Sequence, residues 1–204
     1  MKQTSALQSR IRRTIAVNLQ QRVADGQGAK YCTSCASALD DAVTDGRLIR
    51  SCPRCGQIAY RIPTLVAVTI VRSIVHPSHI WLIRRAVDPF IGQWALPGGY
   101  VEFDEHPEEA ARRECAEELA CDVEIDGLVS VHHARYDDEG VVVLCFSGFV
   151  TGGDPHIGEE VLEVRAFPLR SRPALAFNTH EEALHAWSRA RGVGESSLRL
   201  SGGR

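Results

Sequence analysis

Apolar residues follow two different periods along the chain, and each period predicts a different kind of element. An unbroken apolar run at residues 65–71 is typical of a buried central strand, and residues 79–83 read as its hairpin partner. Residues 107–119 change to helical spacing, with a proline in the first turn and acidic residues near the positive end of the helix dipole. Further elements are expected as strands at 122–134, 141–150 and 161–167, and as a last helix at 179–191 that Asn178 or Thr179 would cap.

The two ends of the chain differ from this pattern. Within residues 1–28 an apolar residue recurs every fourth position from Leu7 to Val23, which predicts one stripe of an amphipathic helix with arginines around it. Three interpretations stay open: a helix that packs on the body or on a second subunit, a basic surface-seeking helix, and an organelle transit peptide. Residues 193–204 are rich in glycine and serine, which predicts a flexible tail.

Four of the seven cysteines form two Cys-x-x-Cys pairs with 16 residues between them: Cys32, Cys35, Cys52 and Cys55. This spacing is typical of a structural zinc site, because Zn²⁺ takes four thiolates in a tetrahedron and each short pair supplies two of them. Gly56 follows the second pair, where such a turn needs a residue of unrestricted φ. The alternative is two disulfides in a secreted protein. Three further unpaired cysteines and the lack of a recognisable secretory signal weigh against it.

Length and charge limit the function classes. The chain has 204 residues, enough for one ordinary domain with a small appendage. Its 23 basic and 26 acidic residues leave a formal net charge of -3, so broad binding to nucleic-acid phosphates is not expected. No apolar run approaches the roughly 20 residues of a membrane span, and a cytoplasmic location is expected unless residues 1–28 act as a targeting signal.

A cluster of acidic residues on the helix expected at 107–119 carries the candidate chemistry. Glu114, Glu117 and Glu118 have the i, i+3, i+4 spacing that places side chains on one helical face. Three carboxylates so close repel one another unless a cation lies among them, and hard oxygen ligands suit Mg²⁺ or Mn²⁺. Arg113 could pair with one of them, and a backbone carbonyl near Gly99 could approach the same ion. The alternative is an ordinary solvated acidic face.

The same stretch resembles the Nudix box, whose pattern is G-x5-E-x7-R-E-U-x-E-E-x-G-U with U a bulky aliphatic residue. The fixed positions are occupied by Gly99, Glu105, Arg113, Glu114, Glu117 and Glu118. Cys115 and Cys121 stand at aliphatic positions, which is a mild change because cysteine packs as a small hydrophobic residue. Ala120 replaces the final glycine, at a cost of about 1 kcal/mol if the helix end needs a positive φ. His106 replaces the usual serine cap, which predicts a small loss of stability.

The resemblance implies a fold and an activity. Nudix hydrolases are α/β/α sandwiches with a mixed sheet, and here that domain would span residues 62–192, after a zinc ribbon at 29–61 and the helix at 1–28. The stretch CPRCGQIAYRIPTLVAVTIV resembles the junction between ribbon and first strand in such proteins. The signature of the NADH pyrophosphatases is missing after the box, and RRAVDPFIGQWALPGG with EVLEVRAF is more similar to the ADP-ribose/FAD pyrophosphatases. The reaction implied is Mg²⁺- or Mn²⁺-dependent hydrolysis of a diphosphate between two organic groups.

The resemblance also implies roles for single residues. Glu114, Glu117 and Glu118, with a carbonyl at Gly99, would hold the catalytic cation, and Glu114 would also deprotonate or orient the attacking water. Arg113 would orient the carboxylates, and Glu105 would hold the loop against the helix. Relatives place a further metal or base carboxylate near Glu163, for which Glu159 and Glu160 are rivals. Arg84 and Arg85 are candidates for binding phosphate, and only one of them can face inward because strand residues alternate. The candidates for stacking on adenine or flavin are Phe90, Trp94, Tyr100 and Phe177.

Two other functions remain as alternatives. The first is a sensor that binds ADP-ribose or a dinucleotide without cleaving it, although such proteins usually lose box glutamates that this chain keeps. The second is an RNA-cap hydrolase that uses the ribbon, which is locally basic but has few aromatic residues for stacking. The partner expected is therefore a small nucleotide-derived substrate. A homodimer is a candidate assembly, because Nudix relatives are often dimers.

Overall fold

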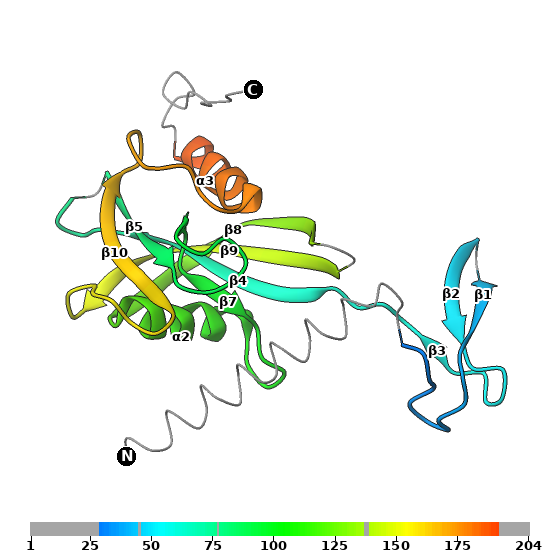
Figure 1. Cartoon of the computed structure of the whole chain (residues 1–204). Helices are drawn as coiled ribbons and strands as arrows, with labels where there is room; N and C mark the ends of the chain where they lie inside the picture. Colours follow the sequence, from blue (N-terminus) through cyan, green and yellow to red (C-terminus); the bar gives the residue numbers. More distant parts are fainter. Residues whose placement is uncertain (1–28, 45, 77, 137–138, 192–204) are drawn as a thin grey trace, which may run out of the picture. The chain divides into compact units, whose positions relative to one another are not determined.

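The computed structural model describes residues 29–44, 46–76, 78–136 and 139–191, and the chain divides into two compact units (Figure 1). The first unit runs to Pro63 and includes Arg135–Gly140, and the second comprises Thr64–Ala134 together with the chain from Val141 onward. The helix expected at residues 1–28 and the tail at 193–204 lie outside the described residues, so both stay predictions. No helix of the described part is long and apolar enough to cross a membrane.

The first unit contains a small antiparallel sheet with the order β1-β2-β3. Its strands are β1 (Asp40–Thr44), β2 (Arg47–Ser51) and β3 (Ile58–Ala59). The buried cluster of this ribbon consists of Cys32, Leu39 and Cys52, with Cys35 and Ala59 packed against it. So small a core cannot offset the loss of chain entropy, and a bound metal is the usual source of the missing stability in such modules.

The second unit is built on a mixed sheet. In the described part of the chain its strands run in the order β10-β5-β4-β9-β8, with the short strands β6 and β7 paired to β5 and β4. Strands β4 and β9 are parallel, whereas β5 pairs with its neighbours in antiparallel fashion. The bounds are β4 (Thr64–Arg72), β5 (His79–Arg85), β6 (Trp94–Ala95), β7 (Gly98–Tyr100), β8 (Asp122–Tyr136), β9 (Glu139–Gly152) and β10 (Val161–Pro168).

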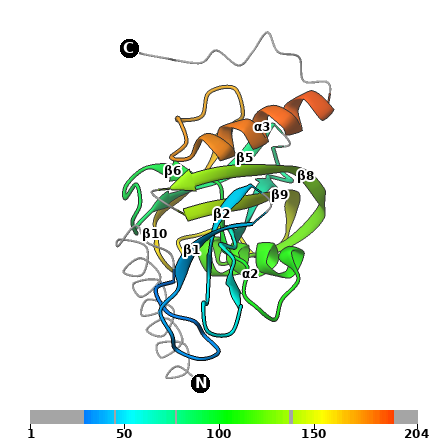
Figure 2. The same ribbon diagram turned by 90° about the vertical axis from the view of Figure 1, so that its right-hand side faces the viewer.

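Two helices cover the opposite faces of this sheet, as Figures 1 and 2 show. Helix α2 (Pro107–Leu119) buries small side chains, among them Ala111 and Cys115, against the core around Ala67 of the central strand. Helix α3 (Asn178–Ala190) buries Ala183, Leu184 and Trp187. The structure therefore confirms the predicted α/β/α sandwich with a mixed sheet. The short strands β6 and β7 had no strand pattern of their own in the sequence.

The starts of both helices differ from the expectation. His106 caps α2 in place of a serine, since its ring nitrogen accepts from the N–H of Glu108 (3.3 Å) and its own N–H donates to Glu109 (2.8 Å). His106 thus fills the capping role of the usual serine, and the small loss of stability expected from this replacement stays a prediction. Helix α3 is capped by Phe177, without a side-chain hydrogen bond, and not by Asn178 or Thr179.

Candidate active site and candidate zinc site

Arg113 organises the carboxylates of the Nudix-like stretch. Its guanidinium binds both carboxylate oxygens of Glu105 (2.7 and 3.0 Å) and contacts Glu114 at 2.6 Å and Glu117 at 3.5 Å. A fifth contact runs to the backbone carbonyl of Tyr100 (3.0 Å) at the end of β7. These partners raise the pKa of Arg113 above its already high ordinary value, Glu105 most of all. The guanidinium of Arg113 thus links the end of β7 and Glu105 to the carboxylates of α2.

Glu118, the last glutamate of α2, lies next to the backbone of Gly98. Burial raises its pKa well above the ordinary value, and the charge of Glu114 raises it further. The N–H of Gly98 donates to Glu118 Oε2 at 2.8 Å, and the charge of Arg85 also favours the ionised form. A carboxylate kept in such a place needs positive charge nearby if it is to ionise.

The missing side chain of Gly99 lets the carboxylate of Glu114 lie directly against the backbone of the glycine pair. A β-carbon at Gly99 would lie 2.7 Å from the carboxylate of Glu114, so any side chain there would fill the space in front of that carboxylate. Hard oxygen donors from a helix, with a backbone close by, match the ligand chemistry of Mg²⁺ and Mn²⁺. Glu114, Glu117 and Glu118 would hold the ion, and the carbonyl at Gly99 could join them.

Of the two candidate phosphate-binding arginines, the structure directs Arg85 toward the box. Arg85 interacts electrostatically with Glu118 and Tyr100, and burial lowers its pKa. Arg84, its neighbour on β5, lies across from Glu163 on β10, and its Nε donates to the carbonyl of Gly92 (2.8 Å). Adjacent strand residues face opposite sides of the sheet, which explains the separation.

The rival carboxylates at the start of β10 separate in the same way. Glu163 contacts Arg84 at 3.8 Å and pairs with Arg165, and the structure does not bring it to the box glutamates. Glu160 instead acts on the pKa of both Arg85 and Glu118, so its charge lies within range of both groups. A register shift between Val161 and Glu163 accompanies the change of side. The resemblance favours Glu163 over its rivals, and the sequence gives no sign of this register shift.

The aromatic candidates also divide into two groups. Phe177 lies under the guanidinium of Arg85 (5.1 Å) and meets Phe90 edge-on at 5.3 Å. Trp94 packs instead against Phe167 at 4.8 Å, opposite Arg84 in the β5–β6 pair. Tyr100 is 57% exposed and follows the glycine pair. Phe90, Phe177 and Tyr100 thus share a neighbourhood with Arg85, and Trp94 belongs to the other side.

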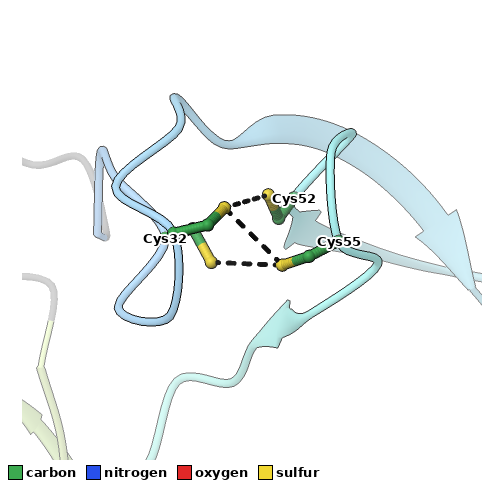
Figure 3. Close-up of side chains that lie close together, drawn as sticks. Cys32, Cys52 and Cys55 are labelled. Carbon is green, nitrogen blue, oxygen red and sulfur yellow. Dashed lines mark hydrogen bonds between the residues drawn. The ribbon is translucent and has the colours of Figure 1, made fainter.

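The ribbon brings the four predicted cysteines together, with their sulfur atoms all within 4.8 Å of one another. Figure 3 shows the cysteines of the two turns, with Cys32, Cys52 and Cys55 labelled, and the sulfur atoms of Cys35 and Cys52 are 3.4 Å apart. All seven thiols are free, so the disulfide alternative does not hold in this structure. Among the described residues, these cysteines are the one group of three or more His, Cys, Asp or Glu side chains close enough together to hold a metal ion. The box carboxylates Glu114 and Glu117 are not in such a group, and both contact Arg113.

The pKa values of Cys35 and Cys55 are shifted in opposite directions. Hydrogen bonds with the side chain and the backbone of Ser37 lower the pKa of Cys35 to about 6. The pKa of Cys55 is lowered by the backbone of Gln57, yet the neighbouring thiols raise it to about 12 overall. Four thiolates at this spacing would repel one another, so all four could ionise together only around a cation. The two turns are alike, as Ala36 and Gly56 take φ of 56° and 74° at equivalent places and donate to the first cysteine of each pair.

A Nudix hydrolase has an α/β/α sandwich with a helix that carries the glutamates of the box. Both features are present here, and Arg113 joins these glutamates to the end of β7. A family model described as NUDIX domain matches residues 63–187, and the chain belongs to the NUDIX family. A solved NUDIX hydrolase from Nitrosomonas europaea superposes with a TM-score of 0.69 at 27% identity, covering 84% of this chain and 97% of that one.

Two proteins of named activity are similar to this chain in sequence. The chain is 36% identical to an ADP-ribose pyrophosphatase of Methanocaldococcus jannaschii over 132 residues, which are 64% of this chain and 78% of that protein. It is 29% identical to the NAD-capped RNA hydrolase NudC of Chromobacterium violaceum over 167 residues, which are 79% of this chain and 60% of that protein.

Proposed function

We propose that this Nudix pyrophosphatase uses Mg²⁺ or Mn²⁺ to hydrolyse a nucleoside diphosphate linked to a second group, with ADP-ribose as the leading substrate. The observation that carries the proposal is the group of box carboxylates held by Arg113 next to Gly99. The similarity to an ADP-ribose pyrophosphatase supports the choice of substrate.

The reaction needs one water and produces two phosphate monoesters. Water attacks one phosphorus of the diphosphate, the bond from that phosphorus to the bridging oxygen breaks, and the bridging oxygen leaves on the second phosphate. A bound divalent cation would neutralise the charge that develops on the phosphoryl oxygens. ADP-ribose would give AMP and ribose 5-phosphate.

The box residues would orient the attacking water, accept its proton and bind the cation. Glu114 would orient the water and accept its proton, because Arg113 fixes the direction of that carboxylate through a 2.6 Å contact. Glu105 holds Arg113 in turn, and it accepts from the N–H of Glu102 at 2.8 Å, which keeps the loop in place. Glu117 and Glu118 would serve as ligands of the cation, with Glu160 as a further carboxylate close to Glu118.

Substrate contacts would come from the side where Arg85 lies. Its Nε donates to the carbonyl of Pro89 (2.8 Å) and it stacks on Phe177, so the guanidinium is held rigidly near the carboxylates. A fixed cation of this kind suits a phosphate oxygen. Phe90 is 40% exposed beside it and offers a flat apolar surface to a base or a ring.

The ribbon would bind one structural Zn²⁺ through Cys32, Cys35, Cys52 and Cys55. The four sulfurs already meet at the spacing that a tetrahedral site needs, and a cation would let all four ionise. The protein would act in the cytoplasm on a small nucleotide-derived substrate, as a monomer or a homodimer.

A second candidate substrate is a 5′-terminal NAD cap on RNA. The match to the NAD-capped RNA hydrolase extends over 167 residues, which is longer than the NUDIX match and therefore reaches beyond that domain. The chemistry at the diphosphate would be the same. The two substrates differ in the RNA chain that is attached to the NAD cap.

One substrate panel tests these proposals together. ADP-ribose, FAD, NADH and NAD-capped RNA are incubated with the protein, with and without Mg²⁺ or Mn²⁺, and the products are identified. Cleavage of the free dinucleotides that requires the cation supports the main proposal, and cleavage of capped RNA alone supports the second. Tight binding of ADP-ribose without cleavage under any condition would mean that the protein is a sensor.

A further inference from the structure

The last turn of α2, which carries Glu117 and Glu118, ends against the connection between β9 and β10. We call residues 153–160 the capping loop. Three of its backbone N–H groups donate to the last carbonyls of α2: His156 to Leu119 (3.0 Å), Gly158 to Glu118 (3.2 Å) and Glu159 to Glu117 (2.8 Å). Helices usually satisfy these carbonyls with their own following residues. Here a distant segment does so.

Gly158 is the closest approach of the capping loop to the helix. A β-carbon at this position would overlap the carbonyl oxygen of Glu117 and lie 2.9 Å from the carbonyl carbon of Glu118. Both neighbours are backbone atoms of residues in the carboxylate cluster, so they cannot rotate away as a side chain could. Any other residue must push the loop and the end of α2 apart.

The capping loop then places Glu160. This residue adopts a left-handed conformation with φ of 58°, which is uncommon for a residue other than glycine and is kept only where neighbours enforce it. Its carbonyl accepts from the N–H of Ala86 (2.9 Å), directly after Arg85. Anchors on α2 and after β5 thus hold Glu160 from both sides, with its charge acting on Glu118.

We propose that Gly158 is a positioning residue of the hydrolase site, because its missing side chain lets the capping loop bond to α2 and so fixes Glu160 relative to Glu117 and Glu118. The inference rests on the proposed function, in which these carboxylates serve one reaction. Gly158 touches neither substrate nor cation in this account, and its effect passes through the position of Glu160.

The test compares Gly158→Ala with Gly152→Ala. Gly152 lies at the start of the same connection, and a β-carbon there would meet only the side chain of Asp122, which can move. Gly158→Ala is expected to lower kcat for ADP-ribose about 30-fold with KM changed less than threefold, whereas Gly152→Ala stays within twofold of wild type. Mn²⁺ affinity, measured by electron paramagnetic resonance without substrate, should fall about tenfold in Gly158→Ala alone.

A double-mutant cycle separates positioning from general damage. In a Glu160→Gln background, Gly158→Ala should lower kcat by no more than about threefold further, because the group that it displaces is already lost. An undiminished 30-fold loss in that background would overturn the proposal, as would a Gly158→Ala protein with wild-type kcat and Mn²⁺ affinity.

If Gly158→Ala does not fold, a second variant replaces it, in which one glycine is inserted between Glu159 and Glu160. This insertion leaves the bonds from the capping loop to α2 in place and displaces Glu160. A similar loss of kcat supports the proposal, and wild-type kcat contradicts it. If wild type cleaves nothing on the panel, the proposed function fails. The Mn²⁺ affinities of the two glycine variants then still decide about Gly158.

Discussion

The ribbon and the carboxylate site gather metal-type ligands in opposite ways. In the ribbon, Cys32 and Cys52 are two of the three residues of the buried cluster, so the ligands are the core. In the larger unit, the glutamates lie on one face of α2, and the other face packs through Ala111, Cys115 and Leu119 into a core that does not include them. If the proposed zinc and catalytic cation are bound, loss of zinc should unfold the ribbon, whereas loss of the catalytic cation should stop catalysis and leave the larger unit folded.

The charges of the two sites support the same contrast. The carboxylates of α2 have a resident cation, Arg113, that holds Glu114 and Glu117 in place. The thiols of the ribbon contact one another instead, as Cys32 and Cys55 do at 3.6 Å. We therefore expect the larger unit to hold its carboxylates in place without a metal, and the ribbon to need the proposed zinc.

The largest expected effect is loss of the ribbon fold in Cys52→Ser. The three remaining thiolates cannot complete a tetrahedron, so the bound zinc and the order of residues 29–63 should both be lost. Zinc analysis and proteolysis of this segment measure the change. The larger unit should keep its thermal transition and its cleavage of ADP-ribose. A wild-type protein purified without chelator that contains no zinc would contradict the zinc site.

The next effect is loss of catalysis without loss of fold. Glu117→Gln and Glu118→Gln each remove a charged ligand and should lower kcat about 10²-fold or more at saturating Mg²⁺. Glu108→Gln is the matched control, because Glu108 lies on the same helix but pairs with Arg112 outside the cluster. Without metal, Glu118→Gln should melt higher than wild type, since burial and Glu114 already disfavour its charge. Equal kcat in all three variants would exclude this cluster as the metal site.

A smaller effect concerns the stability of the larger unit in acid. His180 is buried, and burial lowers its pKa to about 3, with Arg85 and His132 adding to the shift. The unfolded chain binds this proton from about pH 6.5 downward, so the native state loses stability as the pH falls from 6.5 toward 3, by up to about 1.4 kcal/mol per unit. His180→Gln should flatten that slope in urea unfolding with chelator present. An unchanged slope would mean that other groups dominate.

The smallest effect is the relief of backbone strain at two matched alanines. Ala36 in the ribbon and Ala120 after α2 have φ of 56° and 50°, values that favour glycine. Ala36→Gly and Ala120→Gly should each stabilise only the unit that carries it, by up to about 1 kcal/mol. Differential scanning calorimetry of both variants measures this. A shift of both transitions by either change would show that the two units do not melt independently.

Much of this arrangement is readable from local pattern. The spacing of Glu114, Glu117 and Glu118 predicts one helical face, because all three lie within about one helical turn. The two cysteine pairs predict one cluster, because each pair has the short spacing of a metal-binding turn. The predicted bounds of the central strand and of α2 agree with the structure to within one residue at each end. Such features need no knowledge of what packs against them.

The remainder depends on contacts between distant segments. The side to which Arg85 turns depends on where β5 ends, and the position of Glu160 depends on a register shift and on bonds from the capping loop to α2. The same loop shows why Ala120 is tolerated where the Nudix pattern has glycine: the last carbonyls of α2 are satisfied by His156 and its neighbours. No periodicity of a single segment reports such pairings.

The central claim is that the carboxylates of α2 support cleavage and not merely binding, and phosphorus NMR of ADP-ribose tests it most directly. With wild-type protein and Mg²⁺, the two diphosphate signals should be replaced by two monoester signals, at a rate at least about 10²-fold above that of Glu118→Gln. Chelator should stop the reaction and leave the thermal transition of the larger unit in place. Diphosphate signals that persist beside wild-type protein while ADP-ribose binds would contradict the account.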